Sequence, residues 1–151
     1  ADREEYPTTG HSDAFIRFLK EEVQPLVENR YPVKEGERTL IGQSLGGLLA
    51  TEILFKNPGM FDHYIIISPS LWWDAQSLLD TEPGILSLPG SVYIGVGEEG
   101  EVMKKDASSL HEKLRKKYPE RVRLHFQYFP NRDHGDALHE AVYDAFEKIY
   151  R

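Results

Sequence analysis

The sequence predicts an α/β fold, a parallel sheet of about four strands flanked by helices. Three short segments, 39–42, 63–68 and 91–97, are apolar without alternation, as strands are when helices cover both faces of a parallel sheet. Between them lie segments in which apolar residues recur at the three- and four-residue steps of a helix. This alternation of strand and helix is typical of right-handed crossover connections, which produce a parallel sheet.

The individual elements follow in chain order from their periodicity and from the residues that interrupt them. The first is a helix capped by Ser12 or Asp13, in which Pro25 should cause a kink or a restart. The predicted strands are 39–42, 63–68, 91–97 and 121–129. The predicted helices after the first are 45–56, 75–79, 102–118 and 137–150. The last strand alternates apolar and polar residues, with His125 on the polar side, so we expect it half exposed at a sheet edge.

Length and composition limit the classes of protein that fit. At 151 residues the chain is one domain by length, and its 40% hydrophobic and 28% charged residues are ordinary for a globular protein. The formal net charge of −7 argues against a nucleic-acid partner. Without a run of about 18 apolar residues we expect no membrane span. The absence of cysteine removes disulfides, a thiol nucleophile and thiolate metal sites, and leaves the cellular compartment open.

The turn between the first strand and the following helix carries the most informative motif. Gly42 and Gly46 flank Ser44 in the pattern G-x-S-x-G of a nucleophile elbow. Such a turn strains the central residue, exposes its side chain above the sheet, and should leave no room for a Cβ at either glycine. The pattern predicts Ser44 as a nucleophile and the Leu45 N–H as an oxyanion donor at the helix N-terminus. The alternative is a plain glycine-rich turn with a solvated serine.

A serine nucleophile needs a general base, and six histidines compete for that role. Only His134 lies in a loop after a predicted strand end, and it follows Ser44 in the order serine, acid, histidine. His139 lies in the last predicted helix, where a surface histidine is the simpler interpretation. We therefore expect His134 to be the base.

The orienting acid should lie in the loop after the third strand, which holds three glutamates, Glu98, Glu99 and Glu101. Glu99 is the preferred candidate and Glu98 the first alternative. Asp74, in the loop after the second strand, is a rival, and a dyad without an acid also stays open. Acidic loops are often simply solvated, so the residues alone do not decide between them.

Trp72 and Trp73 follow the second strand and could form the wall of a substrate pocket or cap the core. The two interpretations are equally supported by the sequence. No group of His, Asp and Glu has the spacing of metal ligands, and no glycine loop has a phosphate-binding pattern. We therefore expect neither a metal nor a cofactor.

Four stretches together resemble a known family: GQSLGGLLA, SPSLWWD, GVGEEGE and FPNRDHGDALHEAVYDAFEKIY. They are similar to the esterase group of the α/β-hydrolase superfamily, and within it to the enterochelin-esterase-like, siderophore-esterase-type serine hydrolases. The resemblance implies hydrolysis of small-molecule carboxylic esters with Ser44 as nucleophile and His134 as base. It supports Glu99, because the family carries an acid in this glycine-glutamate loop, although some relatives work with a Ser–His dyad.

The resemblance also implies that part of the fold has no counterpart in this sequence. The four predicted strands match the last four of the superfamily, strands 5-6-7-8, and the loop that supplies the second oxyanion N–H belongs to the unmatched half. We therefore expect residues 1–151 to be one domain lacking its N-terminal half. The strand at 39–42 should be unpaired on one side or paired by another chain, and the isolated chain should be inactive or nearly so.

Three functions remain compatible with these residues. The first is a serine esterase that works through an acyl-enzyme. The second is an acyltransferase on the same fold, in which an alcohol replaces water. The third is a catalytically silent binding domain that retains the elbow.

Overall fold

The computed structural model describes residues 6, 7 and 9–151, in two compact units, Ala1–Glu37 and Arg38–Arg151. In the first unit α1 (Ser12–Phe18) continues through a π-helical segment, η1 (Leu19–Val23), into α2 (Gln24–Arg30). Pro25 lies in the first turn of α2, which confirms the predicted restart, because a proline's missing N–H is harmless there. The predicted cap is wrong by one residue: the carbonyl of His11 accepts the first N–H bonds, and Ser12 is already helical.

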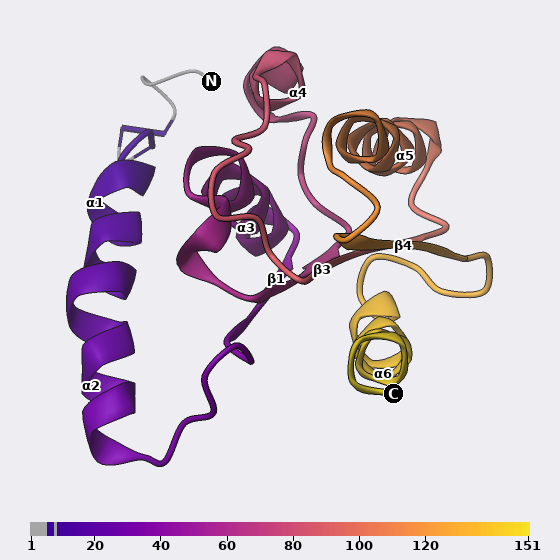
Figure 1. Cartoon of the computed structure of the whole chain (residues 1–151). Helices are drawn as coiled ribbons and strands as arrows, with labels where there is room; N and C mark the ends of the chain where they lie inside the picture. Colours follow the sequence, from indigo (N-terminus) through magenta and orange to yellow (C-terminus); the bar gives the residue numbers. More distant parts are fainter. Residues whose placement is uncertain (1–5, 8) are drawn as a thin grey trace. The chain divides into compact units, whose positions relative to one another are not determined.

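The second unit holds a four-stranded parallel sheet in the order β1-β2-β3-β4, which confirms the predicted fold class. The strands are β1 (Thr39–Gln43), β2 (His63–Ile67), β3 (Ser91–Gly97) and β4 (Arg123–Phe129). The helices are α3 (Leu45–Lys56), α4 (Ser77–Asp80), α5 (Glu101–Lys117) and α6 (Ala137–Tyr150), with short 3₁₀ turns η2 (Pro58–Met60) and η3 (Trp73–Gln76). The helix predicted at 75–79 is therefore split between η3 and α4. Figure 1 shows α3 and α5 on one face of the sheet and α6 on the other.

The two central strands form the centre of the core. Every residue of β2 and of β3 is buried, as expected for strands that are covered on both faces. On the α6 face, Ile65, Ile67 and Tyr93 pack against three buried residues of one helical stripe, Ala141, Ala145 and Ile149. The small alanines let α6 approach the sheet closely, and this fixes where the loop before α6 begins.

The last strand lies at an edge of the sheet as predicted, but its polar side does not face water. Of the polar residues in β4 only Arg123 is exposed, because α6 covers the rest. Lys148 of α6 donates a 3.2 Å hydrogen bond to the Gln127 side chain. His125 Nε2 is buried and has no hydrogen-bond partner among the described residues. The alternating pattern here marks a face that a polar-sided helix partly covers, so His125, expected on the outward side of a half-exposed strand, is half-buried.

The first strand occupies the opposite edge. Within the described residues β1 pairs only with β2, which confirms that the strand predicted at 39–42 has a free side in this sheet. Thr39 bonds the Tyr150 hydroxyl of α6, so Ile41, two residues on, shares the α6 face. Ile41 is 42% exposed and Phe146 and Tyr150 of α6 are 41% and 45% exposed. Both aliphatic and aromatic side chains are therefore exposed beside this edge.

The turn from β1 into α3 brings two backbones unusually close. Ser44 has φ +59° and ψ −121°, a strained conformation for a residue with a side chain. A Cβ at Gly42 would lie 2.2 Å from the carbonyl oxygen of Gly46, whereas a Cβ at Gly46 would meet nothing within 4 Å. A Cβ at Gly47 would lie 3.0 Å from Pro69 Cα. Crowding thus explains Gly42 as expected, but the second crowded glycine is Gly47 and not Gly46.

This difference predicts opposite results for two similar substitutions. Gly42→Ala should lower the free energy of unfolding by about 3 kcal/mol or more, because strand and helix must move apart. Gly46→Ala should be neutral or should stabilise by up to about 1 kcal/mol, because alanine favours the helix. Urea denaturation of the 151-residue chain measures both, and equal losses for the two variants would contradict the crowding argument.

The half-buried imidazole of β4 predicts a pH effect on stability. Burial lowers the pKa of His125, and Lys148 and Arg123 lower it further. The unfolded chain therefore takes up this proton first as the pH falls below about 6.5, and stability is lost from there down to the folded-state pKa. His125→Leu should reduce the loss of unfolding free energy between about pH 7 and pH 5.5. Urea titrations at several pH values test this, with the exposed His139→Leu as control; an unchanged slope for His125→Leu would contradict it.

Candidate active site

The loops that follow the strands converge on one cavity at the carboxyl edge of the sheet, as expected for a parallel sheet. Its volume is about 370 Å³. The residues that line it are Ser44, Ser70, Trp72, Glu98, Glu99, Met103, Asp133 and His134. Four loops and the start of α5 contribute to this set, so residues far apart in sequence meet here.

Ser44 is held at the end of β1 by its backbone. Its N–H donates to the carbonyl of Ile67 at 3.1 Å, and its carbonyl accepts from Leu48 at 3.0 Å and from Ser70 at 3.1 Å. The hydroxyl oxygen lies 3.3 Å from Ser70 Oγ, so the two hydroxyls form a hydrogen bond. These bonds keep the strained turn in place, since no single contact would offset its cost.

Leu45 is the first residue of α3, directly after Ser44. The first N–H groups of a helix have no partner within the helix and carry the positive end of its dipole. Its side chain is 54% exposed, and the backbone N–H is the group that could bind an oxyanion beside Ser44.

His134 and Glu99 form a close pair across two loops. The distance from His134 Nδ1 to Glu99 Oε2 is 2.5 Å. The Glu99 side chain is 2% exposed and that of His134 is 47% exposed. The second carboxylate oxygen of Glu99 accepts the Gly97 N–H at 2.9 Å and the hydroxyl of Ser68. No hydrogen bond joins Ser44 to His134 in the described structure, although both side chains line the same cavity.

The other candidate acids have different partners. Glu98 binds the Tyr128 hydroxyl and Lys104 at 3.0 Å, and the Tyr128 bond followed by Lys104 lowers the pKa of the Glu98 carboxyl. Asp74 accepts the Ser77 hydroxyl at 3.0 Å and is absent from the cavity lining. Asp133 accepts the Gly135 N–H at 2.7 Å and so closes the turn at the base of the histidine loop. Of the candidate acids, the structure brings Glu99 to His134.

The histidine loop is tied to both neighbouring loops by backbone carbonyls. The Gln43 side chain donates to the carbonyl of His134 at 2.8 Å, and the Glu98 N–H donates to the carbonyl of Arg132 at 2.6 Å. Sequence reasoning missed Gln43, Ser68 and Ser70. All three lie inside the motifs quoted above, directly beside residues that were singled out, and their proximity to those residues is the signal that was available.

The two tryptophans have different positions. Trp72 lines the cavity and is 47% exposed, whereas Trp73 is half-buried and is not part of the lining. Their ring centroids are 5.7 Å apart, so the two rings contact each other. Trp72 therefore lies at the cavity, and Trp73 lies beside it.

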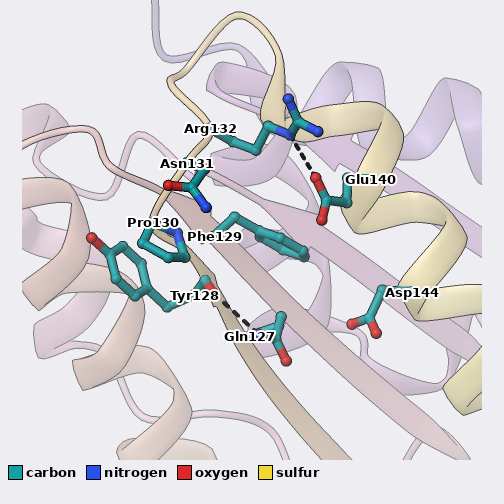
Figure 2. Close-up of a pocket in the computed structure, with 8 residues that line it drawn as sticks. All are labelled: Gln127, Tyr128, Phe129, Pro130, Asn131, Arg132, Glu140 and Asp144. Atoms are coloured by element: carbon teal, nitrogen blue, oxygen red, sulfur yellow. Dashed lines mark hydrogen bonds and ion pairs between the residues drawn. The ribbon is translucent and has the colours of Figure 1, made fainter.

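A second cavity, of about 340 Å³, lies between the end of β4 and α6 (Figure 2). None of Ser44, Glu99 and His134 lines it. Arg132 pairs with Glu140 across it at 2.5 Å, and Asp144 is held by Lys148 at 2.7 Å and by the Tyr93 hydroxyl at 2.6 Å. These partners account for its charged groups, and the Arg132 pair anchors the histidine loop on α6.

The described residues hold neither a metal-ligand cluster nor a membrane-spanning helix. No three His, Cys, Asp or Glu side chains there group as metal ligands. Over the same residues, none of the helices combines the length and apolar character needed to cross a bilayer.

Comparison with known proteins finds relatives that are esterases by name. The ferri-bacillibactin esterase BesA of Bacillus subtilis is 29% identical over 147 residues, which are 91% of this chain and 51% of the relative. The siderophore enterobactin esterase of Emericella nidulans is 32% identical over 149 residues, which are 93% of this chain and 44% of the relative. This chain thus spans about half the length of these relatives.

A solved structure, the BES protein from Bacillus cereus, superposes with a TM-score of 0.85 at 30% identity and covers 93% of this chain and 56% of its own. The enterobactin and salmochelin hydrolase IroE superposes with a TM-score of 0.72 at 26% identity and covers 93% of this chain and 57% of its own. The family model described as "Putative esterase" matches residues 2–139. The chain therefore belongs to this esterase family and has an α/β-hydrolase-type fold.

Proposed function

We propose that this chain carries the catalytic residues of a serine hydrolase that cleaves small-molecule carboxylic esters through an acyl-enzyme. One observation carries the proposal: a serine in a strained elbow and a histidine paired with a buried carboxylate line the same cavity. Strain at a solvent-facing serine and an oriented imidazole are both costly to maintain, and their coincidence suits nucleophilic catalysis. The names of the relatives support the same chemistry.

In this mechanism His134 donates a hydrogen bond from its Nδ1–H to Glu99, so that Nε2 is free to accept the hydroxyl proton of Ser44. Ser44 exchanges its bond to Ser70 for one to His134 when substrate enters, and its oxygen attacks the ester carbonyl. The Leu45 N–H stabilises the oxyanion. His134 then protonates the leaving alcohol, and a water molecule activated by the same imidazole releases the acid and restores Ser44.

The substrate class follows from the cavity and from the relatives. Trp72 and Met103 give the cavity an apolar wall against which an acyl or aromatic group could pack. The relatives named above act on siderophore esters by their names. We infer a small-molecule ester of this kind as the substrate, with no cofactor.

We further propose that full activity needs chain that pairs with β1. The relatives carry about as much chain again, and the β1 edge is open in this sheet. In the superfamily the second oxyanion donor comes from outside the matched half. The loss of one donor costs roughly two to three orders of magnitude in rate, so the 151-residue chain alone should turn over esters slowly.

The assignment of the nucleophile predicts a covalent reaction at one residue. A fluorophosphonate probe should label the chain, and Ser44→Ala should abolish labelling and hydrolysis of a short p-nitrophenyl ester without changing the circular dichroism spectrum. Intact-mass spectrometry counts the label, and a competing alcohol in the assay separates transfer from hydrolysis. Labelling that persists in Ser44→Ala would remove this residue from the mechanism.

The assignment of the acid predicts unequal effects for two adjacent glutamates. Glu99→Gln should slow hydrolysis, but roughly a hundredfold less than His134→Ala does, because the imidazole keeps its proton-accepting nitrogen. Glu98→Gln is the matched control and should change the rate less than about threefold, since this exposed side chain binds Tyr128 and Lys104. The measurement is kcat/KM for each variant, and a larger loss in Glu98→Gln than in Glu99→Gln would reverse the assignment of the acid.

A further inference from the structure

We propose that Ser68 and Ser70 are positioning residues, and that the loop Ser68-Pro69-Ser70 fixes the acid and the nucleophile of the site at once. This inference rests on the proposed function for its consequence, but each half of it concerns a contact that can be observed without turnover. Ser68 reaches the carboxylate of Glu99, and Ser70 reaches the hydroxyl of Ser44. Neither serine has a role in proton transfer in the mechanism above.

The first half concerns the buried carboxylate. Ser68 is fully buried, and its hydroxyl donates to the same Glu99 oxygen that accepts the Gly97 N–H at 2.9 Å. The other oxygen is thereby left to His134 at 2.5 Å. Two donors on one oxygen and His134 on the other set the rotation of the carboxylate plane, and loss of the Ser68 donor would weaken this restraint. Ser68 thus determines which oxygen faces the imidazole.

The backbone of Ser68 gives independent support. Its φ is +46°, in the left-handed region that favours glycine or asparagine over serine. Its N–H nevertheless continues the pairing of β2 with β3, through a 2.8 Å bond to the carbonyl of Gly95. The structure thus holds a fully buried side chain at a backbone conformation unfavourable to it, and that side chain makes a contact to Glu99 that glycine could not make.

The second half concerns the nucleophile. Ser70 is 3% exposed, its N–H donates to the Ser44 carbonyl at 3.1 Å, and its hydroxyl lies 3.3 Å from Ser44 Oγ. The backbone bond fixes the distance between the two residues, and the hydroxyl bond then selects one χ1 rotamer of Ser44. When Ser70 donates in this bond, the Ser44 proton stays available for transfer to His134.

Pro69 keeps the two serines at a fixed separation. Pro69 packs directly against Gly47 of α3, so closely that a Cβ added at Gly47 would lie 3.0 Å from Pro69 Cα. The loop cannot move away from α3 without losing this contact. Proline also removes a backbone rotation between the two serines. The loop therefore acts as a rigid connection between the acid loop and the elbow.

The test uses Ser68→Ala, Ser68→Gly and Ser70→Ala in the 151-residue chain. Ser91→Ala is the matched control, because Ser91 is also fully buried and its hydroxyl also bonds a side chain, His63 Nδ1 at 2.7 Å, outside the cavity. Two NMR observations apply whether or not the chain is active. They are the downfield proton resonance of the His134–Glu99 hydrogen bond and the three-bond couplings that report the Ser44 χ1 rotamer. The rate of fluorophosphonate labelling is the third readout.

Both Ser68 variants should weaken or abolish the downfield resonance and slow labelling by about tenfold, while the Ser44 couplings stay unchanged. Ser70→Ala should average the Ser44 couplings and slow labelling by about tenfold, while the resonance stays. Ser91→Ala should leave all three as in the parent chain. Ser68→Gly removes the backbone strain, so equal losses in the glycine and alanine variants assign the effect to the hydroxyl.

An unchanged resonance in both Ser68 variants, or a loss in Ser68→Ala that Ser68→Gly restores, would overturn the role of the Ser68 hydroxyl. Unchanged Ser44 couplings in Ser70→Ala would overturn the role of Ser70. Absence of labelling in the parent chain would instead contradict the proposed function, and the two NMR readouts would still decide the positioning of Glu99 and Ser44.

Discussion

The close contact between Gly42 and the carbonyl of Gly46 is the constraint on which the rest of the site depends. A strand can run directly into a helix only if the two backbones touch, and a Cβ at Gly42 would lie 2.2 Å from that carbonyl oxygen. The contact forces Ser44 into its left-handed conformation and raises its side chain above the sheet. The backbone bonds to Ile67 and Ser70 then stabilise a turn that the local sequence would not adopt by itself.

A parallel sheet gives the other site residues their common location. All four strands end at the same edge, so the loops after β1, β2, β3 and β4 face one another even though the chain between them is long. At this edge one carboxylate, Glu99, is buried among three donors, which come from the end of β3 and from the loops after β2 and β4. A buried carboxylate is stable only when it is hydrogen-bonded in this way, and its partners thereby fix the orientation of His134.

The two edge strands of the sheet, β1 and β4, differ in how far they are covered. At β4 the helix α6 places Lys148 over the polar side of the strand, and the strand is covered even though it has one neighbour. At β1 the exposed Ile41 lies on the same face as the aromatic residues Phe146 and Tyr150 of α6. Exposed apolar side chains beside an open strand edge are the surface features that another strand and its helix would cover.

The sequence by itself determined the class of fold and the chemical character of the site. Strand and helix periods, the glycine-flanked Ser44 and a histidine in the last strand-end loop are local features, because each depends on a few adjacent residues. The motifs also identified the family that the comparisons then showed. The resemblance to the superfamily also implied the free side of β1, and the strand order of the structure has β1 at an edge.

Only the tertiary structure decided between residues that are adjacent in sequence. Glu98 and Glu99 are equivalent by position, yet one points to Tyr128 and Lys104 and the other to His134, because successive side chains in a loop end face different loops. Trp72 and Trp73 separate in the same way. Gly46 and Gly47 differ only in what packs against them, and His125 is partly covered by a helix that begins twelve residues later. These choices depend on contacts between distant segments, and no local pattern contains them.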